Sequence, residues 1–134
     1  MQHDALATTS TPGKAALWTG RVFSGLLVAM LIMSAVMKFT GGPEFAAGLA
    51  LLGIPVDLVA TLAVIELSCV ALYLLPQTAV LGAVLITGYL GGAVFAHVRI
   101  GDPFVGPLVF GVLAWAGLYL RDPRLRRLLP LRSV

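Results

Sequence analysis

The stretch Thr87–Pro103, TGYLGGAVFAHVRIGDP, decides how this chain folds. Its first half is apolar and rich in glycine, and it then brings His97, Arg99 and Asp102 together within six residues. No other part of the sequence places three types of ionisable side chain so close to a long apolar run. The pattern predicts a membrane-spanning helix that reaches the membrane surface and presents a polar cluster there.

The composition of the whole chain also indicates a membrane protein. Of its 134 residues, 59% are hydrophobic and 11% are charged, against about 45–50% and about 25% in soluble domains. The mean hydropathy is +0.99. Because a small soluble domain has a large surface relative to its volume, it could not hide so much apolar surface from water. We therefore expect an integral membrane protein.

Four apolar runs predict four membrane spans, at about residues 15–39, 56–75, 78–98 and 104–120. The uncharged centre of the first run has 16 residues, fewer than the roughly 20 that cross a bilayer. We expect Arg21 and Lys38 to complete this span as snorkelling ends. A cleaved signal peptide is the alternative interpretation of the first run, but it would place the basic C-terminal tail outside the cell.

A short helix is predicted between the first two spans, at about residues 43–53. Gly41-Gly42 breaks the preceding helix, and Pro43 suits the first position of a new one. Some ten residues are too few to cross a bilayer, so we expect this helix to lie at the membrane interface. The predicted fold is all-α, an integral membrane four-helix bundle with a short interfacial helix between spans 1 and 2.

The basic residues predict the orientation of the bundle. Five of the nine are arginines after position 120, in a basic tail at residues 121–134. Such a tail directly after a span is typical of the cytoplasmic side of a membrane, and it lacks the aromatic and basic surface pattern of a nucleic-acid-binding protein. We therefore expect no nucleic acid as a partner, a cytoplasmic basic tail, and a flexible cytoplasmic tail at residues 1–14.

Three small residues recur at intervals of four in the third span, at Gly88, Gly92 and Ala96. A stripe of this kind lets another helix approach closely, although glycine is in any case common in membrane helices. We expect the stripe to be a helix-packing surface.

Glu66 is an acidic residue in the middle of the second span. At 1.5 Å per residue it lies about 13 Å below Asp57, near the centre of the bilayer. A carboxyl group at this depth is costly unless it is protonated, hydrogen-bonded or in contact with water. Two interpretations stay open: a carboxyl group that transfers protons or anchors a ligand, and a neutral one that joins two helices. By depth in the membrane, Thr87 and Tyr89 lie near Glu66, and the Lys38 side chain reaches part of the way down towards it.

The polar cluster at the end of the third span is the second candidate site. In the functional interpretation, Lys38 and Arg99 hold an anionic or quinone-like headgroup and His97 exchanges protons near neutral pH. In the structural interpretation, Arg99 pairs with Asp102 and orders the turn. The catalytic candidates are therefore Glu66 and His97, and the ligand-binding candidates are Lys38, Glu66, Tyr89, His97 and Arg99.

The chain itself carries no recognisable cofactor or metal motif, and a quinone is the external cofactor that we consider. A single membrane histidine, His97, cannot supply two axial haem ligands within one chain. The single cysteine, Cys69, cannot form an intrachain disulfide. We expect Cys69 to be a core residue.

Several of these residues and short runs form one pattern along the chain. They are Arg21, Ser34, Lys38, the run Leu52–Pro55, Glu66, the run Gly92–Asp102 and the closing run Leu120–Arg126. With them the chain resembles, over about residues 17–131, the DoxX-like family of small bacterial membrane proteins. The resemblance implies a four-helix bundle in the bacterial inner (plasma) membrane and, through relatives in redox complexes, sulfur or quinone chemistry that would need a partner here.

Three functions agree with these features. The first is a quinone- or lipid-facing subunit of a membrane redox complex, with a polar pocket opening on the outer face. The second is a non-enzymatic binder or carrier of a small amphipathic molecule, and the third is a structural assembly partner. The expected partners are membrane lipid and other membrane subunits or a second copy of the chain.

Overall fold

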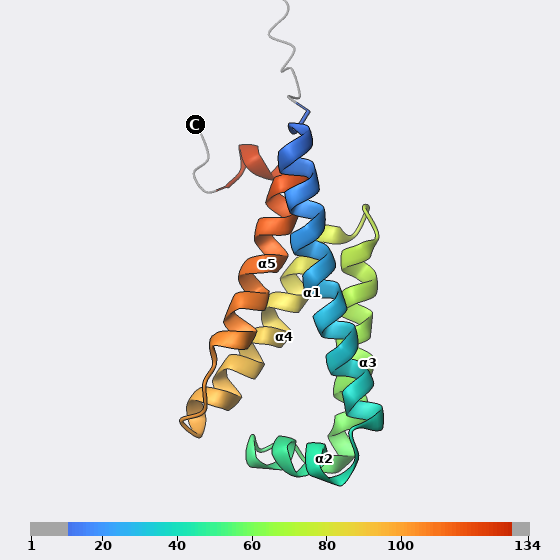
Figure 1. The fold of residues 1–134 in the computed structure, drawn as a ribbon, viewed down its shortest axis with the longest axis vertical. Coiled ribbons are helices and arrows are strands. Elements are labelled where there is room, and N and C mark those ends of the chain that lie inside the picture. Colours follow the sequence, from blue (N-terminus) through green and yellow to red (C-terminus); the bar gives the residue numbers. More distant parts are fainter. Residues whose placement is uncertain (1–10, 130–134) are drawn as a thin grey trace, which may run out of the picture.

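The computed structural model describes residues 11–129, and every regular element in that range is helical. The elements, in chain order, are α1 (Lys14–Thr40), α2 (Gly42–Leu51), α3 (Val56–Leu74), α4 (Ala79–Arg99), α5 (Val105–Arg121) and the short 3-10 helix η1 (Leu125–Arg127). Figure 1 shows the four long helices close together at the end where α1 begins and α5 finishes, and α4 and α5 diverging from α1 and α3 towards the other end, where α2 lies crosswise. The predicted all-α fold is confirmed.

The four long helices form a ring of neighbours. Helix α1 packs against α3 and α5, and α4 also packs against α3 and α5. The beginning of α1 and the end of α5 lie at one end of the bundle, which we call the terminus end (Figure 1). Helix α2 contacts α1 and α3 at the opposite end, which we call the α2 end.

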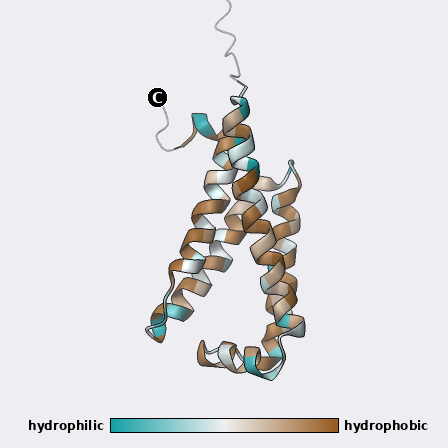
Figure 2. Ribbon diagram, in the orientation of Figure 1, coloured by the Kyte–Doolittle hydropathy of each residue, from teal (hydrophilic) through white to brown (hydrophobic). Residues whose placement is uncertain are grey.

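The outside of the bundle is apolar, as a surrounding lipid phase requires. Helices α1, α3 and α4 are long and apolar enough to cross a membrane, and α5, with 17 residues, is at the lower limit of length for a crossing. Hydrophobic residues predominate along the helices (Figure 2), and many are exposed, such as Val112 at 61%. Since exposure on this scale is unfavourable in water and neutral in lipid, the chain is an integral membrane helical bundle.

Close helix packing depends on three glycines that the sequence analysis did not single out. A Cβ atom added at Gly82 of α4 would meet the backbone nitrogen of Tyr73 in α3. One added at Gly20 would meet the carbonyl oxygen of Gly117, and one at Gly117 would meet Ser24. These contacts bring α4 against α3 and α1 against α5, because a missing side chain lets two backbones approach.

The predicted stripe of Gly88, Gly92 and Ala96 does not make such a contact within the described chain. Gly88 and Gly92 are exposed, and no atom lies within 4 Å of a Cβ atom added at either position. The stripe faces away from α3 and α5 because the contact surface of α4 follows its buried residues, from Gly82 through Ile86 to Leu90. A packing role for the stripe therefore depends on a helix from outside the described residues.

The described part of the basic segment folds back against the end of α5. Residues 1–10 and 130–134 of the predicted tails lie outside the described range. Arg121 belongs to α5, and η1 folds back so that Leu125 is buried. Arg126 anchors this turn by donating to the carbonyl oxygens of Tyr119 at 3.2 Å and Leu120 at 2.8 Å. The first part of the basic segment thus caps the last carbonyl groups of α5.

Candidate functional site

A buried ion pair joins α1 to α3. Lys38 Nζ donates to Glu66 Oε2 at 2.8 Å and to Ser34 Oγ at 2.7 Å. The Lys38 and Glu66 side chains are 7% and 2% exposed. The pairing corrects the expectation that Lys38 is a snorkelling end of its span, since its ammonium group turns inward. Each charge supplies the partner that makes the other tolerable in an apolar interior.

Tyr89 of α4 lies beside the Lys38–Glu66 ion pair. Lys38 Nζ lies 6.0 Å from the centroid of the Tyr89 ring, within the range of a cation–π contact. Ser34, Lys38, Glu66 and Tyr89 come from three helices, and we call them the ion-pair site. The site holds one cation, one anion and two hydroxyl groups, all inside the membrane-spanning part of the bundle.

Thr87, which depth alone placed near Glu66, lies on another face of α4. Its hydroxyl accepts a hydrogen bond from Trp115 Nε1 of α5 at 2.7 Å and donates one to the carbonyl oxygen of Ala83 at 2.7 Å. Depth along the membrane therefore does not bring the Thr87 side chain to Glu66. The α4 residue beside Lys38 is Tyr89.

The polar cluster at the end of α4 does not join the ion-pair site. Arg99 Nη2 donates to the carbonyl oxygen of Leu52 at 2.8 Å and so connects α4 to the end of α2. Gly53 has a positive φ of 79° and no side chain, and a Cβ atom there would collide with the guanidinium group. Arg99 is therefore a link between two elements of the chain at the α2 end.

The Arg99–Asp102 pair of the structural interpretation is absent, and Asp102 lies beside His97 instead. The distance from His97 Nε2 to Asp102 Oδ2 is 3.6 Å, and His97 Nδ1 donates to the carbonyl oxygen of Ala93 at 2.7 Å. Gly101, with a φ of 71°, reverses the chain, and the Asp102 nitrogen then donates to the His97 carbonyl oxygen at 3.0 Å. This turn carries Asp102 back over His97 while the Arg99 side chain extends towards α2.

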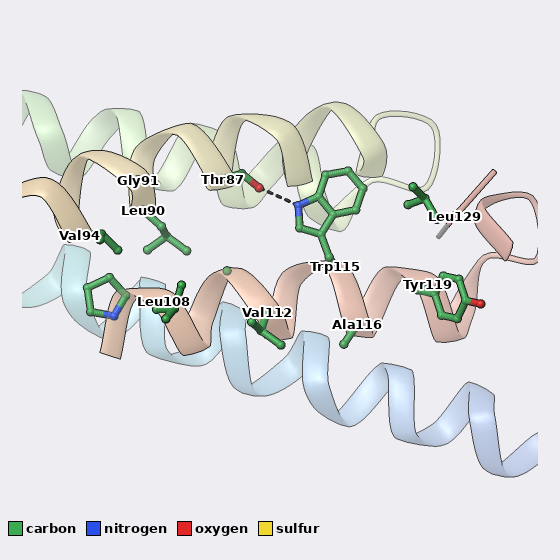
Figure 3. Close-up of a pocket in the computed structure, with 12 residues that line it drawn as sticks. Thr87, Leu90, Gly91, Val94, Leu108, Val112, Trp115, Ala116, Tyr119 and Leu129 are labelled. Atoms are coloured by element: carbon green, nitrogen blue, oxygen red, sulfur yellow. Dashed lines mark hydrogen bonds between the residues drawn. The ribbon is translucent and has the colours of Figure 1, made fainter. Parts of the chain in front are cut away.

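An open apolar groove of about 580 Å³ runs between α4 and α5 (Figure 3). Leu90 and Val94 line it from α4, and Leu108 and Val112 line it from α5. The Trp115–Thr87 hydrogen bond crosses it (Figure 3). This groove was not predicted from the sequence, although small residues on both helices, among them Gly91 and Gly111, were a signal for it. Neither Glu66 nor Lys38 lines it.

A second buried polar network lies at the terminus end, and the sequence analysis missed it as well. The Tyr73 hydroxyl donates to the carbonyl oxygen of Ala114 at 2.8 Å and lies 2.9 Å from Ser24 Oγ. It thereby joins α3 to α1 and α5. The Arg121 guanidinium stacks 5.4 Å from the centroid of the Tyr73 ring. A tyrosine near a helix end usually marks the membrane interface, so its sequence position did not indicate burial.

Tyr73→Phe is expected to lower the free energy of unfolding by about 1–3 kcal/mol, because it removes two hydrogen bonds and leaves the Ser24 hydroxyl buried without its partner. Chemical unfolding in mixed micelles measures this change. Tyr119→Phe is the matched control, since the hydroxyl of Tyr119 has no hydrogen bond to the described residues. Equal losses in the two variants would contradict a structural role for the network.

Arg99→Gln is expected to loosen α2 from the rest of the bundle, since it breaks the hydrogen bond to the Leu52 carbonyl oxygen. Hydrogen–deuterium exchange should become faster in α2 and stay unchanged in the buried parts of α3 and α4. Arg124→Gln is the control, because the Arg124 side chain is exposed at the opposite end. Unchanged exchange in α2 would show that the hydrogen bond does not hold the helix.

Metal binding has no visible donor set: within residues 11–129, His, Cys, Asp and Glu do not gather in any group of three or more that could hold an ion. Cys69 is buried in the hydrophobic core, in the position expected for a small apolar residue.

The fold and the ion-pair site together define a class of protein, a small helical membrane bundle that encloses a pair of opposite charges. The chain belongs to the DoxX-like family, whose family model matches residues 22–117. This range contains the ion-pair site and the polar cluster of α4, and it leaves Arg21 and Leu120–Arg126 outside. No curated protein and no solved structure gave a match.

Proposed function

We propose that this protein is the quinone-binding subunit of a membrane redox complex and that the ion-pair site holds the quinone headgroup. The observation that carries the proposal is the Lys38–Glu66 pair, buried inside a bundle whose other core residues are almost all apolar. A buried ion pair adds little stability compared with well-packed apolar side chains. Ionisable residues inside membranes commonly mark paths for protons or substrates.

The chemistry of the site suits a quinone ring. Lys38 Nζ has three N–H donors, and two of them are used by Ser34 and Glu66. The third donor, which lies beside the Tyr89 ring, is available for a carbonyl oxygen of a quinone. Reduction of a quinone to a quinol takes up two electrons and two protons. The Lys38–Glu66 pair can carry protons, and in this proposal a partner subunit delivers the electrons.

The proposed entrance lies at the α2 end. Helix α2 packs only against α1 and α3, and its connection to α4 is the Arg99–Leu52 hydrogen bond. Movement of α2 would open a way between α1 and α4 towards Lys38. In the proposed orientation both termini are cytoplasmic, because most of the basic residues lie at the terminus end, and the entrance then faces the outer side of the inner membrane.

Two observations favour alternative functions. The apolar groove between α4 and α5 is large enough for part of a lipid chain, as a carrier of an amphipathic molecule would need. The exposed stripe of Gly88 and Gly92 suits close docking of a helix from another subunit, as an assembly partner would need.

Quinone binding in lipid nanodiscs tests the proposal. We expect the wild-type protein to bind a short-chain ubiquinone analogue, and the double variant Lys38→Met/Glu66→Leu to bind it at least about tenfold more weakly, a loss of about 1.4 kcal/mol. The double variant removes both charges together and leaves neither one buried alone.

The matched control is Lys14→Met/Glu44→Gln, which removes one cation and one anion that are both exposed. This control is expected to bind the analogue as the wild type does. Equal binding by the wild type and the Lys38→Met/Glu66→Leu variant would refute the headgroup assignment, as would the absence of any binding by the wild type.

A further inference from the structure

A small pocket at the terminus end combines two cations with an apolar wall. Its volume is about 200 Å³. The residues that line it come from three helices and are Arg21, Ser24, Gly25, Val28, Tyr73, Leu74 and Arg121. No carboxylate stands among them, so within residues 11–129 the lining carries positive charge only.

The two guanidinium groups lack an anionic partner in the described chain. The ion pairs found there involve Lys38 and His97. Arg121 Nε donates to the Gly117 carbonyl oxygen at 3.3 Å, while Arg121 Nη2 is buried without a hydrogen-bond partner among the described residues. Asp122 is close in sequence, but its carboxylate accepts from the Arg124 backbone nitrogen at 2.9 Å.

Arg21 is held where it can act together with Arg121. Its guanidinium lies 5.3 Å from the centroid of the Trp18 ring, one turn earlier in α1. Tryptophan prefers the headgroup region of a bilayer, which puts the pocket at the depth of the lipid phosphates. Buried donors without partners are costly, and a phosphate oxygen would supply the missing acceptor through charge-assisted hydrogen bonds.

The rest of the pocket suits the chain that is attached to such a phosphate. Gly25 and Val28 of α1 and Leu74 of α3 form an apolar wall beside the two arginines. A soluble anion would leave this wall uncovered, whereas a phospholipid would cover it with the upper part of an acyl chain. An ammonium-bearing headgroup would bring a third cation next to the two guanidinium groups, so a lipid with net negative charge fits better.

We propose that Arg21 and Arg121 bind the phosphate group of an anionic phospholipid at the terminus end of the bundle. This lipid site lies at the opposite end from the entrance proposed for the quinone, and it stands whether or not the ion-pair site binds a quinone. Its consequence is a fixed anionic lipid in a pocket that α1, α3 and α5 form together.

Native mass spectrometry of the detergent-purified full chain tests the proposal, with phosphatidylglycerol and phosphatidylcholine of identical acyl chains as probes. We expect one phosphatidylglycerol molecule to be retained with at least about tenfold higher affinity than phosphatidylcholine. Arg21→Gln/Arg121→Gln should abolish most of this preference. Arg124→Gln/Arg127→Gln, which removes two exposed arginines at the same end, should preserve it.

Three results would overturn the lipid site: equal retention of the two lipids by the wild type, an equal loss in the Arg124→Gln/Arg127→Gln control, or displacement of phosphatidylglycerol by excess inorganic phosphate, which would indicate a site for the free anion. Arg21→Gln alone keeps the test decisive if Arg121→Gln disturbs folding, because the Arg21 side chain is exposed. This single change should also reduce the preference for phosphatidylglycerol.

Discussion

Replacing Glu66 with leucine is expected to lower the free energy of unfolding by about 3–5 kcal/mol, since it leaves the Lys38 ammonium group buried without its anion. The remaining hydrogen bond to Ser34 supplies no opposite charge. Steric trapping in bicelles measures the unfolding free energy of a membrane protein without removing the lipid. The loss is expected to be the largest of any single change considered for this protein.

A double variant shows whether the stability lost in Glu66→Leu comes from the unpaired charge of Lys38. Lys38→Met/Glu66→Leu removes both charges. Its free energy of unfolding is expected to be close to the wild-type value or higher, because replacing a buried ion pair by apolar residues is often neutral or stabilising. Glu44→Gln, at an exposed position of α2, should have no effect. A double variant as unstable as Glu66→Leu would mean that the shape of the two side chains, and not their charge, stabilises the bundle.

Gly82→Ala is expected to destabilise the protein by about 1–3 kcal/mol or more, because the new methyl group meets backbone atoms of Leu72 and Tyr73 that cannot turn away. Helices α3 and α4 would have to separate, and the packing around the core residues Ala79 and Ala83 would loosen with them. Unfolding free energies in bicelles again provide the measurement.

Gly88→Ala is the control for this substitution, because it makes the same chemical change on the same helix. Nothing lies within 4 Å of the added Cβ atom, so the variant should be neutral or more stable by up to about 1 kcal/mol, the helix propensity gained over glycine. Similar losses at the two positions would show that glycine supports α4 through its flexibility and not through close packing.

The fold was predictable because its signals are physical and local. Long apolar runs set the helices that must satisfy their own backbone hydrogen bonds in lipid, and chain breakers such as Pro43 separate them. The close contacts between helices were harder to predict from the sequence. The sequence contains many glycines in membrane helices, and nothing local separates Gly82, which touches α3, from Gly88, which faces outward.

The site was predictable only in part. Depth along the membrane brought Glu66, Tyr89 and Lys38 to the same region, but depth says nothing of the direction in which a side chain points. Thr87 and Tyr89 are two residues apart, and at 3.6 residues per turn their side chains point about 160° apart, so only one of them can face Glu66. Helical periodicity, applied to these two residues, would have separated them.

The Arg99–Asp102 pair of the structural interpretation is absent for a different reason. Opposite charge and nearness in the sequence favoured it, but Gly101 adopts a positive φ and the turn carries Asp102 over His97. The contact that Arg99 makes instead is to a residue 47 positions earlier. Contacts between residues so far apart in the sequence depend on the arrangement of the helices and cannot be inferred from local spacing.

The contact between α1 and α5 has a consequence for biosynthesis. These helices are the first and the last of the bundle, and their seam includes Gly20, Ser24 and Gly117. Until α5 has left the ribosome and entered the membrane, one side of α1 and one side of α4 have no neighbour within the chain. The nascent protein therefore passes through a stage of three spans, in which surfaces that the finished bundle covers are still open.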